Sequence, residues 1–340
     1  MRKSSSISQG LVAASLFARS TIAGYALTSS FTPSTFFSSD FDFFTGTDPT
    51  AGFVNFVDAK TATDINLVGV SNTSIYIGVD STNVTPNGRP SVRLSSKKSF
   101  DKGLLIVDVQ HMPGGMCGSW PALWLLGSGT WPDKGEIDIV EGVNQQLANA
   151  MTLHTNADCV VDNPSTTASG DSTSQPYSGN LLTPDCDINA SGQPKNAGCS
   201  ISASNASSPS TYGTEFNARG GGIYATEWNS SGIIIWFFPR SGSIPSDITT
   251  DTPDPSSWKT APLARFAGKG CDIDKHFSNM SIIIDTTFCG AWAGDPKVWE
   301  AGGCAKATGA QSCDAYVRDN PAAFGEAYWI FGDFKIFQKD

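Results

Sequence analysis

The stretch Gly135-Glu136-Ile137-Asp138-Ile139-Val140-Glu141-Gly142-Val143-Asn144 decides how the rest of this chain is interpreted. It places three carboxylates in an apolar run that otherwise has the composition of a buried β-strand. Burying an unpaired carboxylate is costly, so three acids in one such strand require a functional reason.

The spacing of these acids predicts a β-bulge. Side chains alternate with period 2 along a strand, so Glu136 and Asp138 share one face. Glu141 stands at an odd offset from Glu136 and would point to the opposite face of a regular strand. One extra residue in the Ile139-Val140 pair would restore the parity and bring all three acids onto one surface. The expected result is a paired-carboxylate site.

The composition favours a neutral ligand. The 340 residues carry 22 basic and 32 acidic side chains, and the net charge of −10 argues against a nucleic-acid partner or an anionic membrane surface. Aromatic residues make up 11% of the chain and charged residues only 16%, against roughly 25% charged residues in typical soluble domains. This balance is typical of an exported β-protein with an aromatic cleft, and we expect it to be a monomer.

The amino end has the pattern of a signal peptide. Met1-Arg2-Lys3 precede a short apolar run from Leu11 to Ala18. Arg19, directly after this run, departs from the usual pattern, and Ala23 and Ala26 offer cleavage points. The apolar run is too short to cross a bilayer as a mature helix. We therefore expect residues 1–26 to be removed and the protein to be secreted; the alternative is a cytosolic tail.

Cysteines and glycosylation triplets agree with export. Eight cysteines without a repeated Cys-x-x-Cys pair favour disulfides over a zinc site. Their pairing is open, because eight cysteines allow about 105 connectivities. Asn-x-Ser/Thr acceptors, each weak alone, begin at Asn72, Asn83, Asn189, Asn205, Asn229 and Asn279.

Short β-rich runs between turn residues recur along the chain, and no window of similar length has a convincing helical period. They cover residues 53–57, 65–70, 74–79, 91–94, 104–109, 122–126, 137–141, 151–155, 223–228, 233–238, 281–286 and 327–337. We predict an all-β sandwich of two antiparallel sheets, formed by one domain over residues 27–340.

Two long irregular segments interrupt this pattern, residues 156–222 and 239–279. Cysteines fall in both, so we expect ordered loops that are held by disulfides and frame a cleft. The alternative is a pair of flexible surface insertions.

Glu136 and Glu141 are the natural pair for cleaving a glycosidic bond with retention of configuration. Retaining glycosidases need two carboxyl groups roughly 5–5.5 Å apart, one as the nucleophile and one as the acid. Like charges held close together raise the pKa of at least one group, which would keep Glu141 protonated while Glu136 stays ionised. Asp138 would orient Glu136.

Other readings of the acids remain open. They could be ordinary surface charges, although the apolar neighbours argue against full exposure. They could hold a hard cation, but His111, His154 and His276 have no paired spacing, so we expect no metal. We also expect no cofactor, because no nucleophile elbow, phosphate-binding loop or dinucleotide glycine pattern is present.

The residues also match a known family. Glu-Ile-Asp-Ile-Val-Glu at 136–141 resembles the signature of glycoside hydrolase family sixteen, and the chain from about 54 to 337 is similar to secreted fungal laminarinases, which are endo-1,3(4)-β-glucanases. The other matching motifs are Ser91-Val92-Arg93, His111-Met112-Pro113, Trp120-Pro121-Ala122, Met151 to Thr155, Trp236 to Arg240, Phe288-Cys289-Gly290, Trp292-Ala293-Gly294 and Ala327-Tyr328-Trp329.

This resemblance implies a β-jelly-roll with a cleft on its concave sheet, and a covalent glycosyl-enzyme mechanism. It implies that Glu136 is the nucleophile, Asp138 its assisting acid and Glu141 the general acid/base. Further residues match positions that line the sugar cleft in such enzymes: Arg93, Trp124, Trp131, His154 and Trp292.

Each cleft residue also has a purely structural reading. A tryptophan or histidine can be a core residue, and Arg93 can be an ion-pair partner. We interpret Trp120, Trp236 and Trp329 as core. The apolar stretch from Leu125 to Gly129 departs from the polar residues common in such enzymes, which leaves subsite detail open.

The sequence thus predicts a β-glucan as the partner and an endo-β-glucanase as the function. The rivals are a wall-remodelling transglycosylase with the same intermediate and a non-catalytic glucan-binding lectin on the same fold. The linkage preference is not set by these motifs.

Overall fold

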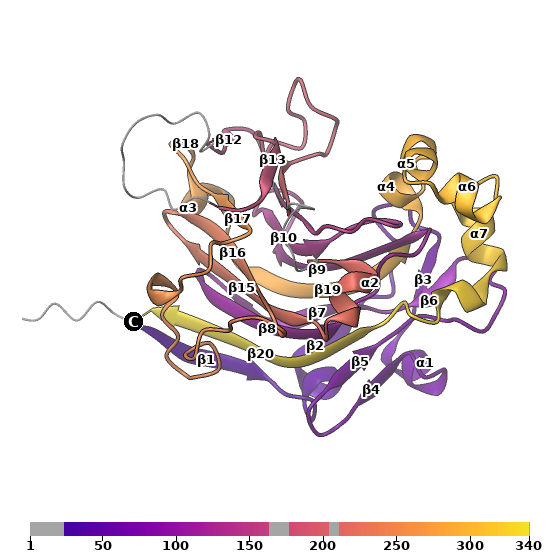
Figure 1. The fold of residues 1–340 in the computed structure, drawn as a ribbon, viewed down its shortest axis with the longest axis horizontal. Helices are drawn as coiled ribbons and strands as arrows, with labels where there is room; N and C mark the ends of the chain where they lie inside the picture. The colour runs from indigo at the N-terminus through magenta and orange to yellow at the C-terminus, as the bar shows by residue number, and fades with distance from the viewer. Residues whose placement is uncertain (1–23, 163–176, 204–210, 340) are drawn as a thin grey trace, which may run out of the picture.

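The structure, a computed structural model, describes residues 24–162, 177–203 and 211–339. Within these residues, two eight-stranded antiparallel sheets lie face to face (Figure 1). The predicted all-β sandwich of two antiparallel sheets is therefore confirmed.

The first sheet contains the two ends of the described chain. Its strands are β1 (Tyr25–Phe31), β4 (Val68–Val70), β5 (Ile75–Ile77), β8 (Gly103–His111), β15 (Gly222–Asn229), β16 (Gly232–Pro239), β17 (Ala264–Phe266) and β20 (Trp329–Lys339). They are ordered β17-β16-β15-β8-β20-β5-β4, and β1 pairs with β20. Tyr25 in β1 donates a hydrogen bond of 2.8 Å to Glu227 in β15, which joins the first strand to the middle of this sheet.

The second sheet carries the acidic stretch. Its strands are β2 (Phe41–Phe43), β7 (Arg93–Phe100), β9 (Ser119–Gly127), β10 (Glu136–Glu141), β11 (Ala150–His154), β13 (Asn180–Thr183), β14 (Cys199–Ser202) and β19 (Met280–Phe288). Their order is β13-β14-β11-β10-β9-β19-β7-β2. The strand β10 is therefore an interior strand, flanked by β9 and β11.

The main core lies between the two sheets because strand residues alternate between this layer and the outer faces. In β20, Trp329, Phe331 and Phe334 are fully buried. Phe334 packs against Phe36 with ring centroids 5.5 Å apart, and Phe36 stacks on Phe41 at 4.2 Å. Trp236 and Trp329 are buried, which confirms their interpretation as core residues.

Helices are the main departure from the sequence prediction. The described residues contain α1 (Ala59–Asp64), α2 (Gly213–Ala218), α3 (Ile273–His276), α4 (Gly290–Ala293), α5 (Pro296–Ala301), α6 (Cys304–Thr308) and α7 (Cys313–Asp319). Each is at most two turns long, too short for a 3.6-residue period to stand out. The helix α1 also displaces the start of the strand expected from residue 65, which begins at Val68.

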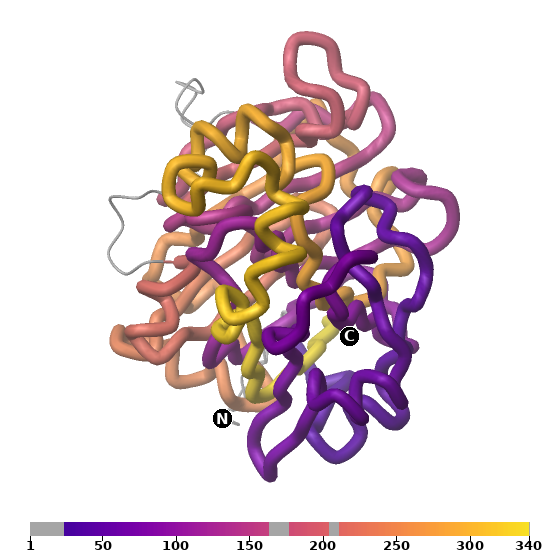
Figure 2. Tube along the Cα trace, turned by 90° about the vertical axis from the view of Figure 1, so that its right-hand side faces the viewer, coloured from indigo at the N-terminus to yellow at the C-terminus, as the bar shows by residue number. Residues whose placement is uncertain are grey.

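The helices α4 to α7 gather at one end of the sandwich (Figures 1 and 2). Two disulfides hold them there, Cys117–Cys304 and Cys289–Cys313. A separate apolar cluster around Trp299, Val317 and Phe324 fills the space beneath them. Among the described residues, no helix has the length and apolar character needed to cross a membrane.

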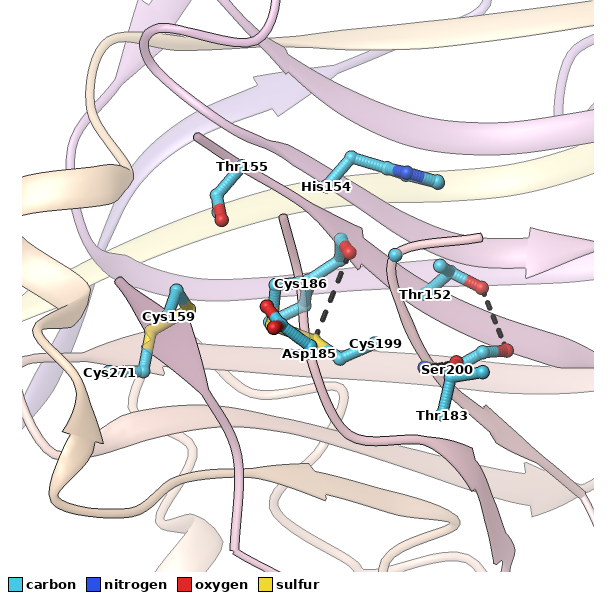
Figure 3. The surroundings of a disulfide bond; sticks show 12 residues. Thr152, His154, Thr155, Cys159, Thr183, Asp185, Cys186, Cys199, Ser200 and Cys271 are labelled. Carbon is cyan, nitrogen blue, oxygen red and sulfur yellow. Dashed lines mark hydrogen bonds between the residues drawn. A yellow bond between two sulfur atoms is a disulfide. The ribbon is translucent and has the colours of Figure 1, made fainter. Parts of the chain in front are cut away.

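Disulfides hold both long irregular segments, as the sequence predicts. Cys159–Cys271 joins the first segment to the second, and Cys186–Cys199 closes a loop within the first. Figure 3 shows both bonds near the strand that carries His154. The segments also contain short elements that were not predicted, including the small sheet of β12 (Cys159–Val160) and β18 (Gly270–Cys271). Residues 163–176 and 204–210 of the first segment lie outside the described residues.

We expect the Cys159–Cys271 bond to contribute more stability than Cys186–Cys199. It closes a loop with a sequence separation of 112 residues, against 13 for the other bond. Chain entropy predicts about 4–5 kcal/mol for the longer loop and about 3 kcal/mol for the shorter one. Denaturant unfolding of the two double Cys→Ser variants measures the order, and the reverse order would contradict the entropic argument.

Candidate active site

The predicted bulge lies at Ile139. The partners of β10 on β9 are Leu126 for Glu136, Trp124 for Asp138, Leu123 for Val140 and Ala122 for Glu141. The register thus shifts between Asp138 and Val140, and Ile139 is the extra residue. Because the partners of the three acids are separated by even steps on β9, the acids lie on one face of the sheet. The expectation of a shared acidic surface is confirmed.

The other face of β10 explains why this strand stays in the sheet. Ile137, Ile139 and Val140 are at most 1% exposed and belong to the main core between the sheets. Burial of each such side chain stabilises the fold by about 1.5–3 kcal/mol. The apolar residues of the motif therefore hold the strand, and the acids occupy its outer face, which we call the site face.

His154 lies beside two of the acids. It is the direct partner of Glu136 on β11, and its Nε2 lies 3.3 Å from Asp138 Oδ2 and 3.9 Å from Glu136 Oε1. The imidazole is only 8% exposed. Gly198 leaves room for it, since a Cβ at this position would lie 2.9 Å from His154 Nδ1, and its φ of +59° also favours glycine.

Two indoles donate hydrogen bonds to the two glutamates. Trp131, in the turn before β10, donates from Nε1 to Glu136 Oε2 at 2.7 Å. Trp120, at the start of β9, donates from Nε1 to Glu141 Oε1 at 2.8 Å. Trp131 is 39% exposed, so its ring is available to a ligand. Trp292 in α4 packs edge-on against Trp120, with ring centroids 5.5 Å apart.

The interpretation of Trp120 as a core residue was wrong. Its side chain is only partly buried and contacts Glu141 on the site face. The sequence held a signal, because Trp120 stands at even offsets from Ala122 and Trp124 and so shares their face in a strand. Its apolar character alone had suggested the interior.

Asp285 in β19 joins two more of the predicted site residues. Trp124 Nε1 donates to Asp285 Oδ2 at 3.3 Å, and Arg93 Nη1 lies 3.9 Å from the same oxygen. The Arg93 guanidinium also lies 4.9 Å from the ring centroid of Trp124 and 4.9 Å from that of Phe44. Asp285 was missed in the sequence, where nothing distinguishes it from any other acid in a strand.

Burial raises the pKa of each glutamate well above the ordinary carboxyl range. For Glu136, burial and then the charge of Asp138 raise the pKa to about 8, opposed by His154 and the Trp131 hydrogen bond. For Glu141, burial and then Asp138 also raise the pKa to about 8, opposed by the Trp120 hydrogen bond and His154. Both groups therefore favour the protonated form far more than a free carboxyl does.

The two aspartates extend this effect. Burial, followed by the charge of Asp285, raises the pKa of Asp138 well above its ordinary range. Burial raises the pKa of Asp285 to about 6, against the favourable charge of Arg93. Asp138 opposes the ionisation of Glu136, because its charge raises the pKa of Glu136 while the proximity of Glu136 lowers that of Asp138. The groups that favour an ionised Glu136 are His154 and the Trp131 N–H, and those that favour an ionised Glu141 are the Trp120 N–H and His154.

The ligand atoms of Glu136, Asp138 and His154 lie within 4.8 Å of one another, so these residues are close enough to hold a cation together. The prediction that the protein uses no metal is not tested by this proximity. Glu136 accepts a hydrogen bond from Trp131, whereas Asp138 Oδ2 and His154 Nδ1 are buried without a hydrogen-bond partner among the described residues.

The structure brings all eight predicted site residues to one region of the second sheet. Trp131 and His154 contact Glu136, Trp124 lies opposite Asp138, and Trp120 connects Glu141 to Trp292. Arg93 joins through Trp124 and Asp285. No described contact tests their roles in binding or catalysis, and these stay predictions.

A sandwich with paired carboxylates on one sheet defines a jelly-roll glycoside hydrolase. A family model described as "XgeA-like, catalytic GH16 domain" matches residues 41–337. The chain therefore belongs to glycoside hydrolase family sixteen, and the resemblance inferred from the sequence is confirmed.

Individual relatives agree. The endo-1,3(4)-beta-glucanase of Arthroderma benhamiae is 44% identical over 323 residues, which are 93% of this chain and 65% of that protein. Laminarinase 16A from Phanerochaete chrysosporium, solved with beta-glucans in donor and acceptor sites, is 40% identical with a TM-score of 0.82, over 93% of this chain and 100% of that chain. An elongating family-sixteen beta-1,3-glucosyltransferase is 38% identical with a TM-score of 0.77, over 92% of this chain and 100% of that chain.

The likeness to solved members of this family confirms the jelly-roll fold. The chain spans less than two thirds of the length of the first relatives, 65% of the Arthroderma protein and 38% of an Aspergillus niger relative. The two solved chains named above are instead matched along their full length.

We expect the Glu141→Gln variant to unfold at higher denaturant concentration than the wild type at pH 8. The pKa of Glu141 rises from an ordinary 4.5 to about 8 in the folded protein, so folded-state stability falls as pH rises between these values. Removing the ionisable group removes this loss, which is on the order of 4 kcal/mol at pH 8 and near zero at pH 4. Unfolding curves at both pH values measure the difference; an equal loss of stability at both would contradict the raised pKa.

Proposed function

We propose that this protein is an endo-β-glucanase that hydrolyses β-1,3 or mixed β-1,3/1,4 glucans with retention of configuration. The observation that carries the proposal is the bulged trio of acids on the site face of a family-sixteen fold. The relatives named above, an endo-1,3(4)-beta-glucanase and a laminarinase, support the substrate class.

In the first step, an oxygen of ionised Glu136 attacks the anomeric carbon of the sugar. The bond between that carbon and the glycosidic oxygen breaks, and the proton of Glu141 passes to the departing oxygen. The hydrogen bond from Trp131 and the imidazole of His154 favour the charged form of Glu136 before the attack. Because its pKa is raised, Glu141 holds the proton that it donates in this step.

In the second step, water attacks the anomeric carbon of the glycosyl ester. Glu141, now ionised, takes a proton from this water, and the bond to Glu136 breaks. The hydrogen bond from Trp120 stabilises Glu141 in its charged state between the two steps. Two displacements at the same carbon give retention of configuration.

The remaining predicted residues supply the surface on which the sugars bind. Indole rings pack against the C–H faces of a pyranose, and Trp131 and Trp292 are both accessible on the site face. Arg93 and His154 can donate hydrogen bonds to hydroxyl groups. Trp124 is 9% exposed and Arg93 is held by Asp285, so these two offer mainly edges and polar atoms.

We also propose that the protein acts outside the cell as a monomer. Four disulfides among the described residues fit an oxidising compartment. Residues 1–23 of the predicted signal peptide lie outside the described residues. Tyr25 and Ala26 pair with Lys339 and Gln338 in β20, so cleavage at Ala23 would keep β1 intact, whereas cleavage at Ala26 would shorten it.

We expect the wild-type protein to release reducing ends from laminarin and the Glu136→Ala and Glu141→Ala variants to lose about 10³-fold or more of that activity, the range in which removal of catalytic groups falls. Azide replaces water as the nucleophile in the second step without needing a general base, so with an activated glycoside it should restore turnover to Glu141→Ala and give a glycosyl azide of retained configuration. In Glu136→Ala azide can take only the place of the missing nucleophile, and the glycosyl azide then has the inverted configuration.

An inactive wild type, or full activity in either variant, would contradict the proposed glucanase activity and the roles of the two glutamates. Parallel assays on laminarin, lichenan and barley glucan give the linkage preference, and NMR of the first product reports the retained anomeric configuration.

A transglycosylase is the second candidate, because one matched structure is an elongating glucosyltransferase. The two activities share the first step and differ in whether water or a sugar hydroxyl receives the glycosyl group. We expect hydrolysis to dominate, with chains longer than the donor below about one tenth of products at millimolar acceptor, since water is about 10⁴-fold more concentrated. Product chain lengths with added laminarioligosaccharide measure this, and dominant elongation would favour the transferase.

A further inference from the structure

We propose that Asn149 is a positioning residue for Glu141, through the backbone of the bulge. The proposal rests on the proposed role of Glu141 as the general acid. It follows from the hydrogen bonds on the side of β10 that faces β11, where the bulge interrupts the sheet.

The pairing of β10 with β11 ends before the bulge. Within the described residues, the pairs run from Glu136 with His154 to Asp138 with Thr152. Beyond Asp138 the backbone of β10 continues to Glu141 without a strand partner on this side. A buried amide or carbonyl without a partner costs about 1–3 kcal/mol, so this segment needs another source of hydrogen bonds.

The side chain of Asn149 supplies them. Its Oδ1 accepts a hydrogen bond of 2.8 Å from the backbone N–H of Glu141, and its Nδ2 donates one of 2.7 Å to the carbonyl of Ile139. A primary amide offers one acceptor and two donors, so it can replace the peptide group of a missing strand partner. The two bonds bracket the bulge at its extra residue and at the acid that follows.

Asn149 is itself held firmly. Its side chain is fully buried. Its backbone N–H donates to Thr211 Oγ1 at 3.1 Å, and its carbonyl accepts from the N–H of Ala203 at 2.8 Å. The amide therefore cannot follow a displaced bulge without breaking contacts to two other segments.

The consequence for catalysis is geometric. Trp120 donates a hydrogen bond to the Glu141 carboxylate. The position of the Glu141 Cα, however, depends on the backbone that Asn149 fixes. A bulge can relax because its extra residue is unpaired, and a small shift would move the acid relative to Glu136. Misplacement by about 1 Å can cost roughly 100-fold in rate. The cost would fall on the step in which Glu141 gives its proton to the leaving group.

Two leaving groups test this assignment. A laminarioligosaccharide needs a proton on its departing oxygen. In a dinitrophenyl β-laminarioligosaccharide, the leaving group is dinitrophenolate, which departs without a proton. Because kcat/KM reports the steps up to the first irreversible bond cleavage, it isolates proton donation from the hydrolysis of the ester. The ratio of the two kcat/KM values within one preparation does not depend on the folded fraction, so a destabilised variant is still informative.

We expect the Asn149→Ala variant to lose about 10- to 100-fold of kcat/KM on the oligosaccharide and less than about threefold on the dinitrophenyl glycoside. Asn149→Asp keeps the volume and the oxygen that accepts from Glu141, and loses the amide donor to Ile139. It provides a second measurement of the ratio and should lie between the wild type and Asn149→Ala.

Asn217 in α2 offers a matched control. Its Oδ1 accepts from the N–H of Met112 at 3.0 Å and its Nδ2 donates to the Met112 carbonyl at 2.9 Å, the same two bonds at a place without a carboxylate. Asn217→Ala should lower kcat/KM on both substrates by the same factor.

The same uniform loss in the Asn149 variants would overturn the positioning role and reduce Asn149 to a stabilising residue. Failure of the proposed function looks different. In that case the wild type cleaves neither substrate, or Glu141→Ala lacks the steep dependence on the leaving group.

Discussion

One unpaired residue in β10 determines the chemistry of this protein. Strand geometry allows only two faces, and the motif must bury Ile137, Ile139 and Val140 while it presents acids on both sides of them. A regular strand cannot do this, because the odd offset would send one glutamate into the core. The bulge at Ile139 solves the conflict by placing two successive apolar residues inward. Everything else at the site adjusts to that irregularity: Asn149 replaces the interrupted ladder, and Trp120 and Trp131 bind the two glutamates.

The arrangement is expensive in stability. Four carboxylates, the trio and Asp285, lie close together on a largely buried surface, and each has its pKa raised by burial before any neighbour is considered. A structure selected for stability alone would place amides or apolar residues there. The compensating groups are three indole N–H groups, one imidazole and one guanidinium. They lower the cost without removing it, because the pKa of both glutamates stays raised to about 8.

The parts of this site that could be predicted are those fixed by local sequence. The bulge follows from parity, and parity depends only on the spacing between Glu136 and Glu141. Contacts between distant strands could not be predicted, because the register of β9 with β19 is a tertiary property. Asp285 therefore had no signal in the sequence, although it binds Trp124 and Arg93. The disulfide pairs were open for the same reason. Trp120 is a different case, because its even offset from Trp124 indicates the site face, whereas its apolar character indicates the core.

The apolar stretch from Leu125 to Gly129, which departs from the polar pattern of related enzymes, affects the site through Leu126. Leu126 is the β9 partner of Glu136 and packs with Ala122, Trp124 and Ile283 in a small cluster on the site face. A polar residue in place of Leu126 would give Glu136 a hydrogen-bonding neighbour and lower the pKa of Glu136 toward the ordinary range. The apolar Leu126 does the opposite, and so leaves the indole of Trp131 and the imidazole of His154 as the groups that favour the charged form of Glu136. Its charge is then set by a few fixed donors rather than by mobile water, which is the condition under which an electrostatic site works best.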